Sequence, residues 1–465
     1  EVKRLDELPA AEAFCLYSNT AADEATVQAV CEQLGGWPLA LRIAGHYLRS
    51  TGESAAEYLR WLEKEPLKEL GDGEHQEENA ALLLRRSVAQ VSDDARLALG
   101  VAGTLAFAPI AREPVAAVLE NDECRARKAL GELVNYGLLE KQEERWQITH
   151  ALVHTYARIE LALSRDSLEL LSWYYIACCD ELSEAGLKGY ARLDGERAHC
   201  LRLMESCFNS ELWQELKYLV VAIYIYLDRQ GWWTELLTSL NIRLTISRKT
   251  GDCKDEGTCL NNLGRIYAQR GELEEALICY DKCLIIYRDI SNRQGEATVL
   301  DGIAIIFRIQ GKYELALQYY EQSLSVKQEI GDQHGEGRTL NNLGMLYDAQ
   351  KDYIQALHFY EQCLPIMQEV GDVTGIGVTL NNIAAIYHAQ GNLTDTLKYL
   401  KQSLEIRQKL GDRAGEAQSY WNIGRTYSAV GNLAKAKEYI NQAIQIAENI
   451  GHPSLNEWLW TLEWM

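Results

Sequence analysis

Asparagines recur in one register of the C-terminal half of the chain, and their amides are suited to binding rather than to catalysis. They are spaced by multiples of forty residues and are Asn262, Asn342, Asn382 and Asn422, with Gly302 in the missing place. An amide offers both a hydrogen-bond donor and an acceptor. On a helix, at about 100° per residue, Asn262 lies roughly 200° from Leu260 and points away from the apolar stripe. We therefore expect ligand-binding amides here; the alternatives are a solvated face or hydrogen bonds between repeats.

Two arginines, Arg265 and Arg425, fall on the same side as these amides, and their guanidinium groups favour acidic ligands. No catalytic residue is expected, because the sequence contains no GxxxxGK[ST], GxSxG or HExxH motif and no convergent Cys/His pair. No metal ligand is expected either. The twelve cysteines are scattered without zinc-finger spacing, and we interpret them as reduced thiols in helix interfaces.

A two-residue mark divides the C-terminal half into repeats of forty residues. The marks are Gly251-Asp252, Ser291-Asn292, Gly331-Asp332, Gly371-Asp372, Gly411-Asp412 and Gly451-His452. Five repeats lie between them, and a fixed period in this range is typical of a solenoid.

The apolar residues of each repeat predict two helices separated by a turn. One position is always small, which lets a neighbouring helix approach closely: Gly264, Ala304, Gly344, Ala384 and Gly424. Another is always a large ring: Tyr267, Phe307, Tyr347, Tyr387 and Tyr427. A third is alanine in four repeats, with one exception: Ala276, Ala316, Ala356 and Ala436, against Thr396.

The pattern Leu-Gly-x-x-Tyr, a turn glycine, then Ala and Tyr resembles the tetratricopeptide repeat (TPR) over all five repeats. Its period is longer than the usual value of about 34 residues. One such repeat cannot bury its apolar stripe alone, so stacking supplies the core. The resemblance implies a right-handed α-solenoid whose concave face binds a protein or peptide. It also implies that the recurring asparagines grip the backbone of that ligand.

Near the N-terminus the chain reads Gly36-Trp37-Pro38-Leu39-Ala40-Leu41. Two glycines end one helix, and Pro38 stands in the first turn of the next, where its missing N–H costs nothing. The stretch resembles the GLPLA motif of the NB-ARC module in STAND nucleotide switches, with Trp37 in place of the usual leucine. The resemblance implies that Pro38 packs against the adenine of a bound nucleotide. The alternative is a helix junction that binds nothing.

Residues 92–148 predict three helices followed by two short strands, which is the order of a winged helix. The segment 146–158 then resembles the MHD segment of the same family, although Thr149 and Ala151 replace its Met and Asp. The resemblance implies that His150 contacts the β-phosphate of ADP, and an imidazole can donate to phosphate in either protonation state. The alternative is a purely structural histidine. The third helix carries little basic charge, so we interpret the winged helix as a packing module rather than a DNA reader.

These patterns predict an all-α fold with one small two-stranded wing. The expected order is a partial NB-ARC-like helical subdomain (1–70), a winged helix (90–160), a helical bridge with a degenerate repeat (161–253), five TPRs (254–450) and a capping helix (451–465). The first residue is Glu1 rather than Met, so we expect a longer natural chain. No cofactor is expected in this chain alone. ADP or ATP belongs to the longer protein if a P-loop domain precedes residue 1.

Composition narrows the partners and the compartment. The formal net charge of -21 argues against a nucleic-acid partner. The longest strictly apolar run covers residues 218–227 and is too short to span a bilayer. Without an apolar signal segment before Leu5, and with scattered reduced cysteines, we expect a cytoplasmic protein.

Three functions fit these observations. The first is the sensor half of a prokaryotic STAND switch, in which the repeats bind a trigger and the Pro38 segment and winged helix hold the nucleotide. By family resemblance, its activation leads to homo-oligomers. The second is a TPR scaffold with no nucleotide dependence. The third is a transcription regulator that uses the winged helix. A P-loop upstream of residue 1 distinguishes the first from the second.

Overall fold

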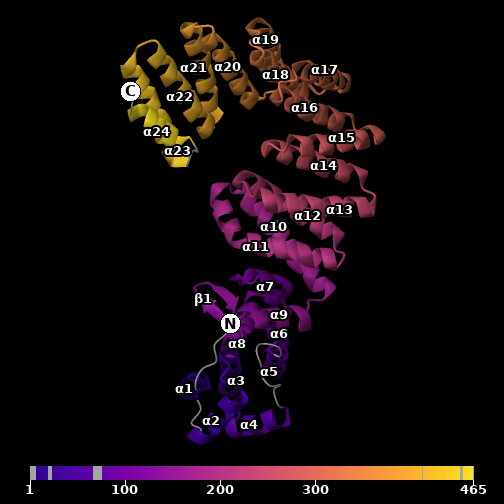
Figure 1. Ribbon diagram of the computed structural model, residues 1–465, viewed down its shortest axis with the longest axis vertical. Helices are drawn as coiled ribbons and strands as arrows, with labels where there is room; N and C mark the ends of the chain where they lie inside the picture. Colours follow the sequence, from indigo (N-terminus) through magenta and orange to yellow (C-terminus); the bar gives the residue numbers. More distant parts are fainter. Residues whose placement is uncertain (1–6, 19–22, 66–75, 411, 451–453, 464–465) are drawn as a thin grey trace. The chain divides into compact units, whose positions relative to one another are not determined.

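The computed structural model describes residues 7–18, 23–65, 76–410, 412–450 and 454–463 (Figure 1). The chain divides into two compact units, an N-terminal unit of residues 1–243 and a C-terminal unit of residues 244–465. Most of the described residues are helical, and the described part of the chain contains one two-stranded sheet, which confirms the expected fold class. None of the described helices is long and apolar enough to cross a membrane.

The N-terminal unit contains thirteen described helices, the last of which continues into the other unit. They are α1 (Glu7–Ser18), α2 (Glu24–Gln33), α3 (Pro38–Thr51), α4 (Ala55–Lys64), α5 (Gln76–Gln90), α6 (Asp93–Thr104), α7 (Glu113–Val118), α8 (Glu123–Asn135), α9 (Ala151–Glu160), α10 (Arg165–Glu184), α11 (Leu187–Asn209), α12 (Trp213–Gln230) and α13 (Trp233–Thr250).

Helix α3 begins where the sequence predicts a helix start. Gly35 and Gly36 adopt positive φ values of 61° and 62°, and Pro38 is the first residue of α3. The helix packs tightly on α1: a side chain at Gly45 would place its Cβ 2.6 Å from Cβ of Tyr17. It also contacts the end of α8, where His46 Nδ1 lies 3.0 Å from the carbonyl oxygen of Asn135. Helix α3 therefore connects the first helices to the segment around α8.

Strands β1 (Leu139–Gln142) and β2 (Arg145–Ile148) follow α6, α7 and α8 and pair antiparallel, with Leu139 opposite Ile148. Three helices and a hairpin thus occur in the predicted order. The assignment of residues 90–160 to a winged-helix domain, like the other domain boundaries, stays a prediction.

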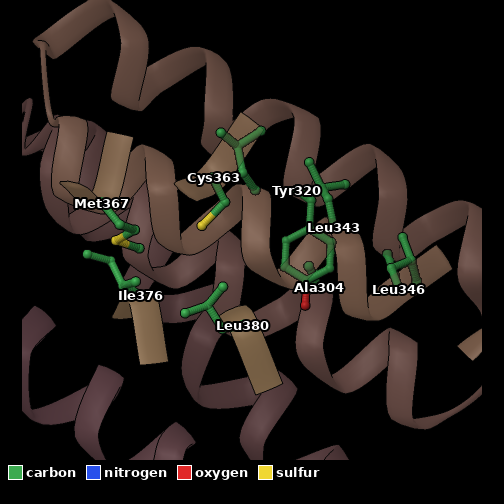
Figure 2. Packing of buried hydrophobic residues seen from close by; sticks show 10 residues of the cluster. Ala304, Tyr320, Leu343, Leu346, Cys363, Met367, Ile376 and Leu380 are labelled. Atoms are coloured by element: carbon green, nitrogen blue, oxygen red, sulfur yellow. The ribbon is translucent and has the colours of Figure 1, made fainter. Parts of the chain in front are cut away.

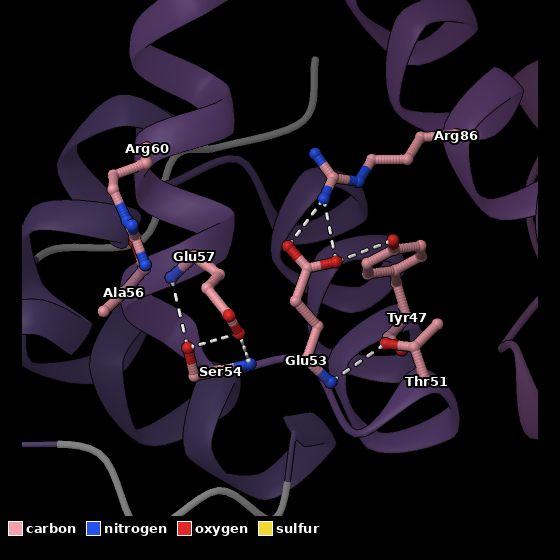
Figure 3. Close-up of polar contacts among 8 residues, drawn as sticks. All are labelled: Tyr47, Thr51, Glu53, Ser54, Ala56, Glu57, Arg60 and Arg86. Atoms are coloured by element: carbon pink, nitrogen blue, oxygen red, sulfur yellow. Dashed lines mark hydrogen bonds and ion pairs between the residues drawn. The ribbon is translucent and has the colours of Figure 1, made fainter.

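A half-buried arginine, Arg86, joins α5 to α3 and α4 (Figure 3). One guanidinium nitrogen of Arg86 donates to both carboxylate oxygens of Glu53, at 2.6 and 2.8 Å. The guanidinium also lies over three rings, 4.0 Å from the centroid of Trp61 and 4.9 Å from those of Tyr47 and Tyr58. Tyr47 donates its hydroxyl to Glu53 at 2.8 Å. Ion pair and rings together fix the position of α5, because arginine stacks on aromatic faces while it binds a carboxylate.

The C-terminal unit is an α-solenoid of helix pairs, and each repeat consists of a first helix and a second helix. The pairs are α14 (Cys253–Gln269) with α15 (Leu273–Asp289), α16 (Arg293–Ile309) with α17 (Tyr313–Ile330), α18 (Gln333–Ala349) with α19 (Tyr353–Glu369), α20 (Val373–Ala389) with α21 (Leu393–Leu410), and α22 (Arg413–Ala429) with α23 (Leu433–Ile450); α24 (Leu455–Glu463) follows and packs on α23.

The recurring two-residue marks turn out to be helix junctions. In the mark Gly331-Asp332, the glycine ends α17 in the left-handed conformation, and Asp332 Oδ1 accepts from the backbone N–H of Gly335 at 2.8 Å to cap α18. Ser291 also takes a positive φ, of 56°, without being glycine. Such an N-cap contributes about 1 kcal/mol. Among the described residues, such a mark ends one repeat and starts the next. Gly411, Gly451 and His452 lie outside the described residues.

The predicted small position allows close packing within each repeat. A Cβ on Gly344 would lie 2.4 Å from the ring of Tyr360, which comes from the second helix of the same repeat. The recurring ring of the first helix stacks on a ring of the second helix at centroid distances of 5.3–5.5 Å. These pairs are Phe307–Tyr319, Tyr347–Phe359, Tyr387–Tyr399 and Tyr427–Tyr439.

Buried apolar residues then continue from one repeat to the next (Figure 2). Met367 of α19, for example, packs in one cluster with Ile376 and Leu380 of α20. A buried polar bond recurs beside this core, from a thiol or hydroxyl of the second helix to a backbone carbonyl of the first. Its members are Cys283 to Gly257, Ser323 to Ala297, Cys363 to Gly337 and Ser403 to Gly377. The core therefore depends on stacking, as expected for a repeat array.

Candidate functional site

The four predicted asparagines lie half-buried on the first helices of their repeats, α14, α18, α20 and α22. Two of them bond to the preceding repeat. Asn382 Nδ2 donates to Asn341 Oδ1 at 3.1 Å, and Asn422 Nδ2 donates to Asn381 Oδ1 at 3.0 Å. Hydrogen bonding between repeats, one of the alternatives, thus occurs at these two positions. Gly302 has no room for an asparagine, because a Cβ there would lie 2.8 Å from the ring of Tyr280.

One pocket, of about 170 Å³, opens between α20, α21 and α22. Two of the predicted residues, Asn422 and Arg425, line it. The rest of its lining is Asn381, Ala384, Ala385, His388, Thr396, Leu400 and Thr426. Thr396, which replaces the alanine found at this position in the other four repeats, therefore lines the pocket. This polar, donor-rich concavity can hold a small group carried by a partner.

A second pocket, of about 420 Å³, lies mainly over α18 and α20, and Asn342 lines it together with Asn341 and Arg338. It already contains an acid–base pair, because His334 Nε2 lies 3.1 Å from Asp372 Oδ2. Asp372 also caps α20 through the N–H of Gly375 at 2.8 Å.

The remaining three predicted partner-binding residues line neither of these two pockets: Asn382 lies on α20, and Asn262 and Arg265 lie on α14. Arg265 donates to Gln269 on its own helix at 3.1 Å. The structure thus brings Asn422 and Arg425 together in one pocket and places Asn342 in the other.

Sequence reasoning missed the polar residues that complete these pockets. Asn341 and Asn381 precede the predicted asparagines by one residue and hold the amides of the next repeat. Their own forty-residue spacing was the available signal. His388 and Arg338 stand at positions without a recurring residue type, so periodicity alone could not single them out.

The two residues predicted to bind nucleotide lie in the N-terminal unit. Pro38 is half-buried at the start of α3, and His150 is half-buried as the N-cap of α9, where its Nδ1 accepts from the N–H of Leu152 at 3.1 Å. Burial and the nearby charge of Arg42 lower the pKa of His150. Arg42 stands one turn after Pro38 on α3 and also lies 3.7 Å from Glu140 of β1. Arg42 therefore links the start of α3 electrostatically to His150.

The cap fixes the tautomer of His150. Because neutral Nδ1 accepts a hydrogen bond, the proton resides on Nε2, which can then donate. This chemistry and the positive charge of Arg42 suit a phosphate. Among the described residues no group of three or more His, Cys, Asp or Glu side chains is arranged to hold a metal ion.

The sequence model of the tetratricopeptide repeat matches residues 255–329, 295–369 and 375–449. The array is built of TPRs. No curated protein sequence matches this chain.

Among solved structures, the chain is similar to a signal transduction ATPase with numerous domains (STAND) that carries a TPR sensor, from Pyrococcus horikoshii. The TM-score is 0.62 at 15% identity, over 98% of this chain and 62% of that protein. This likeness shows the fold, and the chain spans less than two thirds of the length of that protein.

Two further structures share less. Aspartyl phosphate phosphatase F from Bacillus subtilis has a TM-score of 0.44 at 12% identity, over 96% of this chain and 95% of its own. TPR-like repeats of a kinesin light chain from Podospora anserina have a TM-score of 0.35 at 18% identity, over 41% of this chain and 94% of their own. At such TM-scores neither likeness bears on the function of this chain.

Proposed function

We propose that this chain is the sensor part of a STAND-type switch, whose TPR array binds a protein or peptide trigger and transmits binding to a nucleotide-gated module. The observation that carries the proposal is the likeness in fold, over nearly the whole chain, to a STAND protein with a TPR sensor. The same likeness covers only part of that protein, which agrees with a nucleotide-binding domain outside this chain.

The N-terminal unit supplies residues that fit one side of a nucleotide. Pro38 offers an apolar surface for the adenine, and His150 offers an Nε2 donor for a phosphate, with the charge of Arg42 close to it. A bound ADP or ATP would supply the difference in free energy between closed and open states. The residues of this chain bind and orient it, while phosphate chemistry belongs to residues outside the chain.

The array supplies the partner surface. Its first helices carry both pockets, and the amides between successive repeats are fixed by hydrogen bonds rather than free to rotate. Fixed donors and acceptors lose little conformational entropy when a ligand binds. For the trigger to act as a switch, it must bind the open state more tightly than the closed state.

The division of labour can be tested in the natural full-length protein. We expect the double variant Asn342→Ala and Arg425→Ala to abolish activation by the trigger and to leave ADP binding unchanged, because the two functions use different units. Loss of both functions together would contradict the division.

A TPR scaffold without nucleotide dependence is the second candidate. It is favoured by one observation: His150 already has a structural role as the N-cap of α9. The sequence upstream of residue 1 in the natural gene separates the two candidates. A GxxxxGK[ST] loop between a strand and a helix supports the switch, whereas further repeats or a simple start supports the scaffold.

A further inference from the structure

The pocket between α20, α21 and α22 has a chemical preference that the proposed function alone does not specify. We propose that it binds the carboxylate of a glutamate or aspartate side chain in the trigger. The inference rests on the proposed role of the array as the receptor of a protein or peptide, and it names the residue type that this pocket reads.

The charge of the lining points to an anion. Arg425 and His388 line the pocket, and none of its lining residues is acidic, although the chain as a whole carries a formal charge of -21. Two other arginines of the array are neutralised by carboxylates: Arg413 binds Glu416 at 2.6 Å, and Arg288 binds Glu296 at 2.8 Å. Within the described part of the chain, Arg425 forms no ion pair. A guanidinium in this situation favours a carboxylate from outside.

The amides add a donor of fixed orientation. Asn422 is held from two sides, because its Nδ2 donates to Asn381 Oδ1 at 3.0 Å and its Oδ1 accepts from Gln418 Nε2 at 3.2 Å. Because Asn381 Oδ1 already accepts the hydrogen bond from Asn422, the Nδ2 group of Asn381 is the part of this amide that can donate to a ligand. Asn381 and Arg425 thus present hydrogen-bond donors to a ligand in the pocket. An ionised carboxylate suits them, because it only accepts hydrogen bonds.

Size and position favour a side chain within a segment over the end of a chain. A volume of about 170 Å³ is smaller than the usual site of a whole small ligand, and it suits one short side chain. Another pocket lies along the first helices, and Asn342, which lines it, stands two repeats before Asn422. A segment running along these helices therefore continues past the pocket and presents a side chain to it.

The other pocket provides a matched control. Arg338 lines it on α18 and is exposed like Arg425, so the same substitution removes the same charge from the same side of the array. That pocket already holds the carboxylate of Asp372. We therefore expect Arg338→Gln to change acid recognition much less than Arg425→Gln.

The probe is an array of immobilised, C-terminally amidated heptapeptides with a central Glu, Gln or Lys and randomised neighbours, exposed to the whole labelled chain. We expect wild type to bind the Glu peptides about ten- to a hundredfold more tightly than the Gln peptides, the range of one hydrogen bond to a charged group. Arg425→Gln should remove most of that ratio, and Arg338→Gln should preserve it. Circular dichroism of each variant checks that the helices remain.

Each other outcome overturns the inference in its own way. Equal binding of Glu and Gln peptides would refute acid recognition and leave the array as a peptide receptor. Equal losses in the two arginine variants would show unspecific attraction by charge. A companion set of the Gln heptapeptides with a free C-terminus tests the end of a chain, and tighter binding of this set than of the amidated Glu peptides would assign the pocket to a chain end. Absence of binding to every peptide would overturn both this inference and the proposed role of the array in peptide binding.

Discussion

A buried ion pair of the second TPR, in contact with the third, gives the sharpest prediction about stability. Lys327 of α17 bonds to Asp301 of α16 and donates to Thr339 of α18 at 2.6 Å. Its side chain is 4% exposed, and that of Asp301 is 15% exposed. In the next repeat the corresponding residues are Asn341 and Met367, so the chain itself contains the neutral version of this pair.

Lys327→Met should destabilise the C-terminal unit by about 3–5 kcal/mol, because it leaves a buried carboxylate without its partner. For a unit of 222 residues, at about 2–4 °C per kcal/mol, this corresponds to a fall in Tm of about 6–20 °C. The double variant Asp301→Asn with Lys327→Met copies the neighbouring repeat. It should return to within about 1 kcal/mol of wild type or exceed it, because a buried ion pair is seldom more stable than a well-packed neutral pair.

Urea denaturation followed by circular dichroism, with all four members of the double-mutant cycle, measures the coupling. A double variant as unstable as Lys327→Met would refute the reasoning, since it would show that methionine does not fit at this position. A single variant within about 0.5 kcal/mol of wild type would refute it as well, because it would mean that the pair is not desolvated.

Three further predictions concern other contacts. Arg86→Lys should lower the free energy of unfolding of the N-terminal unit by about 2 kcal/mol, because lysine loses the stacking of the planar guanidinium on three rings; the exposed neighbour Arg85→Lys should have no effect in the same urea titration. Gly344→Ala should cost about 1–3 kcal/mol by forcing a methyl group against the ring of Tyr360, whereas Gly131→Ala, with open space around its Cβ, should gain up to about 1 kcal/mol, each read from its Tm. Burial lowers the pKa values of four histidines of the N-terminal unit, namely His46, His150, His154 and His199. The unfolded chain therefore binds more protons than the folded unit, so the urea midpoint should fall as the pH drops from about 7.5 to 5.5. The variant His199→Gln should show a smaller fall in this midpoint. A midpoint that rises over this range would contradict the assignment.

Much of the C-terminal unit could be predicted because each recurring residue type has a local physical reason. Asp332 caps a helix within three residues of itself, and Gly344 leaves room for a ring sixteen residues away, so both signals repeat with the fold. Thr396 departs from the alanine of the other repeats, and in the structure it lines a pocket. The sequence alone showed the departure but not the pocket.

What the sequence could not reveal are contacts whose partners do not recur. Lys327 and Asp301 are 26 residues apart and occur once, and Arg86 reaches Glu53 across 33 residues. No period connects such pairs. The same holds for the candidate nucleotide residues: that the charge of Arg42 acts on His150 depends on how α3 packs against the strand hairpin, which no local pattern encodes.

The coupling of this chain to a nucleotide is tested most directly by measuring ADP binding of the natural full-length protein with two variants of His150. Asn and Asp are equally good N-cap residues, so His150→Asn and His150→Asp both preserve the start of α9 and differ in charge. The account predicts that the wild-type protein binds ADP, that His150→Asn weakens binding modestly and that His150→Asp abolishes it, because a carboxylate repels a phosphate. Equal ADP affinity in all three proteins, or no affinity in any, would contradict a nucleotide role for His150 and leave it as the cap of α9.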